Sequence, residues 1–423
     1  MAMAISCISS PGRNRFRSRT LRLLHRVFKA FQYRDFRVMW AGACTSSIGT
    51  WMQKLAQSWL VLEISGSPFL LGLDAFLGEI PIFLFSLVGG VVADRTDRRR
   101  LLLFSQVTQM TCAFVLAALV AFDMVKVWHI LTLSVVVGLA QAFGGPAYQA
   151  LIPTLVQGDD LPNAIALNSI QFNLARVIGP VLGGLALTKL GATWCFTLNG
   201  MSYIAVICSL LAIRMNFIPA KTQETLIDSM KQGIRFIRKQ GAMESLIALA
   251  FLMTVLGVPM VVFLPVFARD VFRQGADTYT VLLSVSGVGS VSGALAVAAL
   301  GRRPKQGRDL LLMLTALGVV IVGFALSRNL WLSCLFLFLG GALLIGVFAL
   351  VTSLVQLITP DDMRGRVMSV YNVAFRGGMP IGNLLAGSLI PGMSAPVVLA
   401  MNGLALSALG LWFLLVQKRV ASL

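Results

Sequence analysis

The sequence predicts an all-α integral membrane protein built from two six-helix bundles. Three observations support this. The 423-residue chain is 57% hydrophobic and only 12% charged, with a mean hydropathy of +0.83, which is far from the composition of soluble globular domains. Twelve apolar runs of about 20 residues follow one another, and each is long enough to cross a bilayer. A polar, basic stretch divides the runs into two sets of six.

The predicted spans are separated by short polar turns. In the first half we expect them over 36–62, 69–92, 101–122, 128–151, 163–190 and 192–213. In the second half we expect them over 244–268, 279–300, 310–327, 330–354, 366–390 and 395–416. The chain then divides into a basic tail (1–35), an N-terminal bundle (36–213), a linker (214–241) and a C-terminal bundle (242–423).

The N-terminal tail is basic and has no acidic residue before Asp35. Leu21, Leu24, Phe28 and Phe31 recur at helical spacing, which is typical of a basic amphipathic helix on a membrane surface. The same acid-poor composition with arginine and serine also fits an organellar transit peptide. We interpret the segment as a cytoplasmic tail and keep import into an organelle as the alternative.

The linker breaks the apolar pattern but has a periodicity of its own. Its apolar residues recur at steps of three and four and are separated by lysine and arginine, which predicts an interfacial helix with a basic outer face. These apolar positions are Leu226, Ile227, Met230, Ile234 and Ile237.

The distribution of basic residues predicts the orientation of the chain. Clusters of lysine and arginine fall at 95–100, in the linker, at 302–308 and at 364–366, all in loops of even number. Short basic loops stay on the cytoplasmic side. We therefore expect both termini and the linker to be cytoplasmic, in a cell-membrane protein. Topology and attraction to anionic membrane lipid then explain the net charge of +18 without a nucleic-acid partner.

The sequence contains no clear motif for metal binding, phosphate binding or nucleophilic catalysis. The six cysteines are scattered without a Cys-x-x-Cys pair, and the two histidines have no neighbouring ligand in the sequence. The Gly-x-x-x-x-Gly-Lys-Ser/Thr phosphate loop is absent, and no nucleophile motif is found. We expect no metal, no other cofactor and no enzymatic activity, and we expect the protein to be a monomer.

Polar side chains recur on one face of the first span. Residues inside a membrane span that carry polar groups usually face a bundle interior or a water-filled path. These residues are Ser46, Thr50, Gln53 and Gln57, with Lys54 at the edge of their face. We predict that this face lines a cavity. The alternative is that the side chains only form hydrogen bonds between helices.

An internal repeat places one arginine deep in each half. A Leu-Val-Gln run with two following aspartates precedes both the fifth and the eleventh spans, and these spans contain Arg176 and Arg376. Asn168 shares a helix face with Arg176, and Asn372 lies one turn before Arg376. We predict that these four residues line the cavity, where the arginines hold an anionic group. Internal neutralisation by acidic residues is the alternative.

Two acidic residues in the second span are candidates for proton coupling. Glu79 is the first candidate and Asp74 the second, because burial and a neighbouring positive charge have opposite effects on the pKa of a carboxyl group. Either residue is also an expected partner of the intramembrane arginines. The alternative reading of Glu79 is a fixed partner of Lys54.

The loop after the second span resembles the Gly-x-x-x-Asp-Arg-x-Gly-Arg-Arg signature of the major facilitator superfamily, with Asp97 in place of the second glycine. The matching residues are Gly90, Asp94, Arg95, Arg98 and Arg99. The resemblance implies a gating role in which Gly90 permits close helix approach. Asp94 would pair with an arginine or face a helix N-terminus across the two halves. The alternative is a solvated loop that only fixes topology.

The fifth span resembles an exporter motif of the same superfamily at Gly179, Pro180, Gly183 and Gly184, where the glycines permit close contact and the proline a bend. With the runs at 49–53, 62–68, 146–153 and 163–168, the chain resembles the enterobactin exporter branch. This resemblance implies the twelve-helix major facilitator fold, alternating access and proton-coupled efflux of a small molecule such as a siderophore or drug. The alternatives are an uncoupled facilitator or importer, and a transporter-shaped sensor or scaffold.

Overall fold

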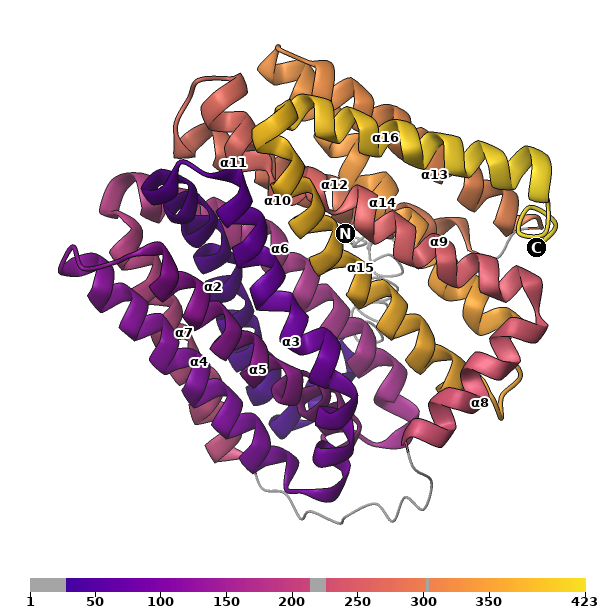
Figure 1. The fold of residues 1–423 in the computed structure, drawn as a ribbon. Coiled ribbons are helices and arrows are strands. Elements are labelled where there is room, and N and C mark those ends of the chain that lie inside the picture. The colour runs from indigo at the N-terminus through magenta and orange to yellow at the C-terminus, as the bar shows by residue number, and fades with distance from the viewer. Residues whose placement is uncertain (1–27, 214–225, 302–303) are drawn as a thin grey trace, which may run out of the picture.

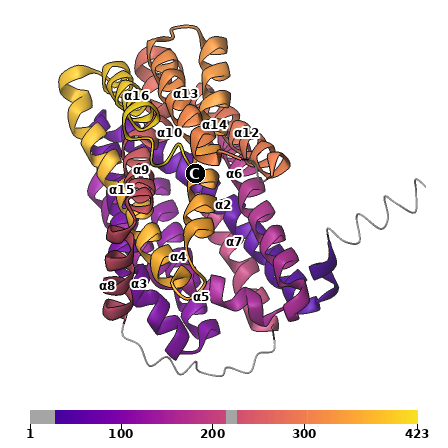
Figure 2. The same cartoon turned by 90° about the vertical axis from the view of Figure 1, so that its right-hand side faces the viewer.

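The computed structural model describes residues 28–213, 226–301 and 304–423, and it is helical throughout the bundle (Figures 1 and 2). The first half contains α2 (Arg34–Ser65), α3 (Pro68–Arg95), α4 (Arg98–Ala121), α5 (Val127–Leu151), α6 (Leu161–Leu190) and α7 (Ala192–Ala212). The second half contains α9 (Gly241–Gly257), α10 (Pro259–Val262), α11 (Leu264–Val266), η4 (Phe267–Val271), α12 (Ala276–Leu300), α13 (Gln306–Leu326), α14 (Leu330–Ile358), α15 (Arg364–Met393), α16 (Ala395–Trp412) and η5 (Phe413–Gln417). The shorter elements are η1 (Lys29–Gln32), η2 (Ile152–Thr154), η3 (Gly158–Asp160) and α8 (Leu226–Lys239).

Within the described residues, ten helical segments are long and apolar enough to cross a membrane. The helices α2 and α15 are as long as these ten, but they carry more polar side chains and fall outside the apolar group. With α9 to η4 counted as one segment, each half has six long helices. The predicted fold, an all-helical membrane protein of two six-helix bundles, is therefore confirmed.

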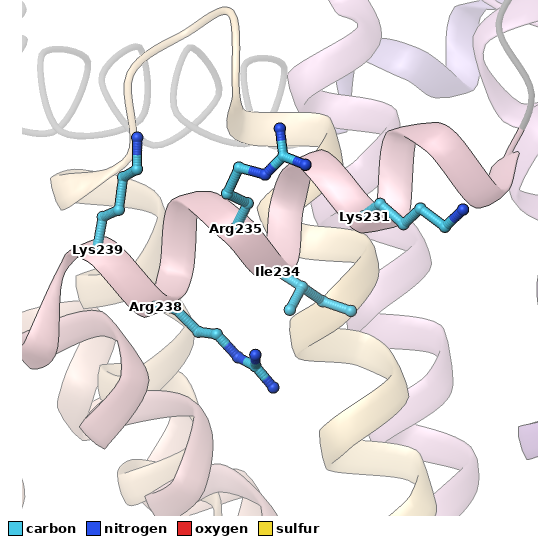
Figure 3. A pocket seen from close by; sticks show the side chains of 5 residues that line it. All are labelled: Lys231, Ile234, Arg235, Arg238 and Lys239. Atoms are coloured by element: carbon cyan, nitrogen blue, oxygen red, sulfur yellow. The ribbon is translucent and has the colours of Figure 1, made fainter.

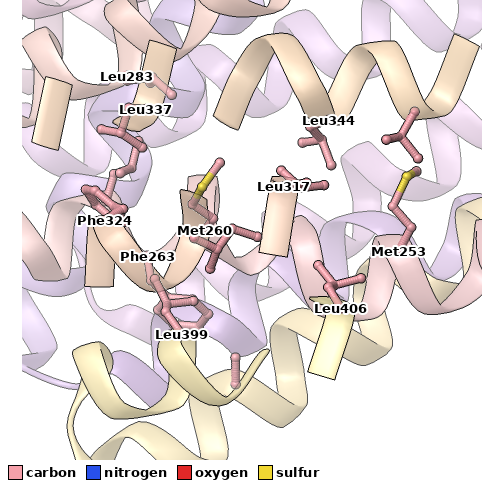
Figure 4. Close-up of a cluster of buried hydrophobic side chains, with 14 of the residues drawn as sticks. Met253, Met260, Phe263, Leu283, Leu317, Phe324, Leu337, Leu344, Leu399 and Leu406 are labelled. Carbon is pink, nitrogen blue, oxygen red and sulfur yellow. The ribbon is translucent and has the colours of Figure 1, made fainter. Parts of the chain in front are cut away.

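The seventh long segment is interrupted, although the sequence predicted one continuous span there. α9 ends at Gly257, and the following turns start with Pro259 and Leu264-Pro265. Proline has no backbone N–H and clashes with the preceding helical turn, so it kinks or ends a helix, and two prolines six residues apart interrupt this one. Met260 and Phe263 of this segment are fully buried and belong to the cluster of hydrophobic side chains in Figure 4.

The two halves meet along two helix pairs, α3 with α15 and α6 with α12 (Figure 1). In each half, the second long helix (α3 or α12) pairs with the fifth long helix (α15 or α6) of the other half. The same pairing therefore occurs twice, as expected for two repeats related by an approximate two-fold axis.

The bundle has two ends. We call the end with the α3–α4 turn, α8 and the starts of α6 and α15 the linker end, and the opposite end the distal end. Close contact between helices joins the two halves at the distal end. A Cβ added at Gly72 would lie 2.6 Å from the carbonyl oxygen of Asn383 and 3.0 Å from the Cα of Gly387. A Cβ added at Gly184 would lie 2.1 Å from the Cγ2 of Thr280. Only glycine fits at these positions without movement of a helix.

Hydrogen bonds and stacked rings also join the halves at the distal end. The Arg269 guanidinium donates to the carbonyl oxygens of Leu62 and Gly66, at 3.1 and 3.2 Å. Gly66 caps α2 in the left-handed conformation, with φ of 63°, and its N–H donates to the Leu62 carbonyl oxygen. A carbonyl oxygen has two lone pairs, so Leu62 can accept from Arg269 as well. The rings of Trp59 and Tyr279 stack with their centroids 6.3 Å apart.

Toward the linker end the tight glycine contacts are mixed: an added Cβ at Gly377 of α15 would still lie 2.5 Å from Phe83 Cε2 of α3, but the contacts closer to that end stay within one half. An added Cβ at Gly89 would meet the carbonyl oxygen of Ala142 in the N-terminal half, and one at Gly293 would meet that of Ala342 in the C-terminal half. One buried hydrophobic core crosses the seam at the distal end, whereas a second core fills only the linker end of the N-terminal half. The halves are therefore joined most strongly at the distal end.

The linker and tail are described only in part. α8 is the helix predicted within the linker, although the side chains of Leu226 and Ile227 lie outside the described residues, as does the tail over 1–27. The end of the tail forms η1, where Lys29 contacts Asp160 at 2.7 Å. This contact with the Asp160 carboxylate raises the pKa of Lys29, because a hydrogen bond to a negative group favours the charged ammonium.

Candidate functional site

A tryptophan and three charged residues form a central cluster between the helices of the N-terminal half. Trp51 and Lys54 lie on α2, Glu79 on α3 and Arg176 on α6. The Lys54 Nζ is 3.6 Å from Glu79 Oε1 and 5.4 Å from the centroid of the Trp51 ring. The Arg176 Cζ is 5.6 Å from the same centroid. The face of an aromatic ring attracts cations, so each of the two positive groups lies close enough to interact with Trp51.

The acidic residues of α3 do not neutralise the two arginines. Glu79 pairs with Lys54, and Asp74 bonds to neutral side chains. Among the residues that the structure describes, neither Arg176 nor Arg376 forms a salt bridge. The expected pairing of these arginines with Glu79 or Asp74 is therefore not present, and the alternative partner for Glu79, Lys54, is the one observed.

Asp74 lies in a buried hydrogen-bond network. Its side chain is only 7% exposed, and the Gln57 amide donates to its two carboxylate oxygens at 3.1 and 3.0 Å. The Ser134 hydroxyl donates to Oδ1 at 2.5 Å and accepts from Gln57 at 3.0 Å. In the described part of the chain, no cation lies within salt-bridge distance of this carboxyl group. Hydrogen bonds, and not a salt bridge, are thus its direct compensation for removal from water.

Most of the polar face on α2 bonds to neighbouring helices. The Thr50 hydroxyl lies 2.9 Å from the carbonyl oxygen of Ser46 and 3.3 Å from the Tyr203 hydroxyl on α7. The Asn199 amide of α7 donates to Gln53 at 2.6 Å. These contacts favour the interhelical alternative over cavity lining for Thr50 and Gln53, whereas Ser46 is buried and its carbonyl oxygen accepts within α2. Likewise, the Tyr148 hydroxyl of α5 donates to Asn168 at 2.7 Å.

Helical geometry places the two arginines on the inner faces of their helices. Nine residues span two and a half turns, so residues nine apart lie on opposite sides. Arg176 is opposite Leu185 and Arg376 is opposite Leu385, and both leucines are 51% exposed on the outside of the bundle. Arg376 and Asn372 are exposed although they lie away from that outer face. The inner face therefore carries accessible positive groups.

The arginine-rich loop after α3 bonds only within the N-terminal half in the described contacts. Arg98 lies 3.4 Å from Asp94 and donates to the carbonyl oxygen of Ala150 at 3.1 Å. Arg99 donates to the carbonyl oxygen of Leu211 at 2.9 Å, and Arg95 is exposed. Asp94 is thus paired with an arginine, as one form of the gating prediction requires, but it has no described contact across the halves.

The close helix approach expected at Gly90 lies at Gly89 instead. An added Cβ at Gly89 would be 2.2 Å from the carbonyl oxygen of Ala142 on α5, whereas one at Gly90 would meet no atom within 4 Å. Successive residues of a helix point about 100° apart, so only one of the two can face α5.

The glycines of the predicted exporter motif pack α6 against two helices. Added Cβ atoms at Gly179 and Gly183 would be 2.4 Å from Trp51 Cβ and 2.9 Å from Met52 Cα, while Gly184 faces Thr280 across the seam. α6 remains helical through Pro180. The motif thus fixes the position of Arg176 beside Trp51.

Several residues of the site were not singled out from the sequence. Ser134 and Asn199 are common polar residues in apolar helices, and only their contacts identify them. Gly72 is one of 39 glycines and no motif marks it. Trp51 could have been identified from the sequence, because it lies within one turn of Lys54, where a cation and an aromatic ring can meet. Among the residues described, no group of three or more His, Cys, Asp or Glu could hold a metal.

Two bundles with a polar, positively charged inner face define a multi-pass membrane transporter. The chain belongs to the transmembrane secretion effector family of the major facilitator superfamily, whose model matches residues 26–422. This family places the chain among transporters and not among enzymes.

Similar proteins agree with this assignment. The multidrug efflux pump Tap of Mycolicibacterium fortuitum is 25% identical over 358 residues, covering 82% of this chain and 87% of the pump. The enterobactin exporter EntS of Shigella boydii is 26% identical over 398 residues, covering 90% and 91%.

Solved structures share the fold. The nucleoside transporter NupG superposes with a TM-score of 0.69 at 12% identity, covering 90% of this chain and 98% of that one. A POT family transporter in complex with 5-aminolevulinic acid gives 0.70 at 12% identity, covering 92% and 97%.

Proposed function

We propose that the protein exports a small organic molecule across the cytoplasmic membrane by alternating access, coupled to protons. The observation that carries this proposal is the asymmetric seam: Gly72, Gly184 and Arg269 join the halves at the distal end. In this interpretation the linker end is cytoplasmic, and the structure is the state that accepts cargo from the cytoplasm. Rocking of the halves would open the distal seam and release the cargo.

The cargo site in this proposal is the inner face between the halves. Lys54, Arg176, Asn372 and Arg376 offer positive and hydrogen-bonding groups there, and only Lys54 has a carboxylate partner among the described residues. Such a face suits a cargo with an anionic group. The names of the relatives, an enterobactin exporter and a multidrug efflux pump, support export as the direction.

The gate in this proposal is the arginine-rich loop at the linker end. Asp94 pairs only with Arg98 here, at 3.4 Å, and it is partly exposed. When the linker end closes, the C-terminal half would approach this loop, and Asp94 would exchange its present partner for a group of that half. The loop would then stabilise the state that opens to the distal side.

For proton coupling we now place Asp74 before Glu79. Glu79 has a cation partner in Lys54, whereas Asp74 has only the neutral donors Gln57 and Ser134. A buried carboxyl group without a cation can exchange a proton when its access to water changes. Opening and closing of the halves would provide that change.

The Asp74→Asn variant tests the coupling. In inverted vesicles with an imposed pH gradient, it is expected to lower gradient-driven uptake of the cargo by at least about tenfold, equivalent to about 1.4 kcal/mol. Counterflow without a gradient should persist, because the variant keeps the size of the side chain. The cargo for this assay comes from comparing metabolites of cells with and without the protein.

Asp123→Asn is the matched control, because it removes a carboxylate from an exposed turn and should leave both activities unchanged. Full gradient-driven uptake in both Asp74→Asn and Glu79→Gln would reject coupling through α3. An uncoupled facilitator would show counterflow and no response to the gradient in the unchanged protein.

A further inference from the structure

The linker helix α8 exposes a continuous basic stripe. Lys231, Arg235, Arg238 and Lys239 recur at steps of three and four residues, which places them on adjoining faces of the helix. All four are exposed, and together with Ile234 they line an open pocket on the surface (Figure 3). In the described part of the chain, none of the four forms a salt bridge with an acidic residue.

The opposite face of α8 is packed against α15, so the stripe has a fixed orientation. Ile237 is 5% exposed. An added Cβ at Gly233 would lie 2.7 Å from the carbonyl oxygen of Arg366 and 3.2 Å from Val370 Cγ2. The helix therefore presents its basic side outward and cannot rotate without losing these contacts.

The stripe lies where the surface of the bilayer is expected. α9, a membrane span, starts directly after α8, and the contacts with Arg366 and Val370 place α8 beside the first turns of α15. Ile234, which is 38% exposed, is the apolar residue among the four cations. Lysine and arginine beside an exposed apolar residue suit a helix in the interface, with aliphatic stems in the apolar layer and charges at the headgroups.

We propose that this stripe binds the headgroups of anionic phospholipids in the leaflet at the linker end. Four cations that have no salt bridge among the described residues are complementary to several phosphodiesters, and anionic headgroups attract basic segments close to the membrane surface. This binding does not depend on transport or on proton coupling. Its structural consequence is that lipid charge holds α8, and through Gly233 the first turns of α15, a helix of the seam.

Photo-crosslinking tests the proposal with the full-length chain in liposomes. Phosphatidylcholine vesicles would contain a small fraction of photoactivatable phosphatidylglycerol, and the crosslinked residues would be mapped by mass spectrometry. Crosslinks are expected within 226–240, and unlabelled phosphatidylglycerol should compete for them whereas phosphatidylcholine should not. Replacing all four cations of the stripe with glutamine should lower these crosslinks by at least about tenfold.

The matched control removes four exposed cations at the distal end by changing Lys126, Lys189, Arg273 and Arg328 to glutamine. It should keep the crosslinks within 226–240. A second variant, with lysine and arginine exchanged at the four stripe positions, should also keep them, because the charge is unchanged. If the glutamine variant does not fold, raising the salt concentration for the unchanged protein should weaken the crosslinks through screening. Crosslinks that are absent from α8, or that phosphatidylcholine displaces equally well, would overturn the proposal.

Discussion

Replacing Gly72 with alanine is expected to lower transport by about tenfold or more and to hold the distal seam open. The added Cβ would lie 2.6 Å from the carbonyl oxygen of Asn383 and 3.0 Å from Gly387 Cα, and backbone atoms cannot rotate away as a flexible side chain can. Overpacking of this kind costs about 1–3 kcal/mol. The cost falls only on the state in which α3 and α15 touch, so the equilibrium shifts toward the distal-open state.

A thiol reporter in the other helix pair measures this shift. Ser284 lies three residues before Gly287, whose added Cβ would meet the carbonyl oxygen of Arg176, and its own hydroxyl is buried without a partner among the described residues. The Ser284→Cys reporter should react faster with a membrane-impermeant maleimide from the distal side when Gly72→Ala is present. Labelling is compared with the parent chain, which corrects for native cysteines.

Gly78→Ala is the control for this prediction. Gly78 lies on the same helix, but an added Cβ there would meet no atom within 4 Å. Its transport and its reporter labelling should match the unchanged protein. If Gly72→Ala also leaves both unchanged, the contact between α3 and α15 does not limit the transport cycle.

Arg269→Gln is expected to shift the same equilibrium by roughly tenfold. Arg269 donates to the carbonyl oxygens of Leu62 and Gly66 in the other half. Hydrogen bonds to charged groups contribute about 1.5–3 kcal/mol when buried. Because the Arg269 side chain is 32% exposed, we expect less, about 1.4 kcal/mol, which corresponds to tenfold. The positive charge also complements the carbonyl end of α2.

The measurement is again the rate at which the Ser284→Cys reporter is labelled from the distal side. Arg273→Gln is the control, because it removes the same positive charge. Arg273 lies four residues further on, is exposed, and has no described hydrogen bond to the N-terminal half. Arg269→Lys should give an intermediate result, since an ammonium keeps the charge but reaches the two carbonyls less well. Equal labelling of Arg269→Gln and Arg273→Gln would show that net charge, and not the bridge to α2, controls the seam.

The sequence predicted the membrane class and the two bundles because apolar run length directly reflects bilayer thickness. It also predicted the helix in the linker, since Ile234 and Ile237 follow its apolar spacing. The break in the seventh span was missed, although Pro259 and Pro265 are clear signals, because a long apolar run favoured one continuous helix.

The site could be predicted only in part. Lys54 and Glu79 stand out as charges within apolar runs, but their mutual contact depends on how α2 and α3 pack. Gly72 has no local signal at all, because its role depends on Asn383 and Gly387 more than 300 residues away in the chain. For the polar face of α2 the sequence predicts cavity lining, with interhelical hydrogen bonds as the alternative, because periodicity shows a shared face and does not identify what faces it.

The polarity of α2 and α15 has a consequence for biogenesis. A helix with several polar groups on one side is a weak membrane-insertion signal by itself, and unsatisfied groups are costly in lipid. α2 precedes the other long helices that the structure describes, and its polar side chains find partners on α3, α5, α6 and α7. Stable integration of α2 therefore depends on helices made after it, so the N-terminal half is expected to enter the bilayer as a group and not one helix at a time.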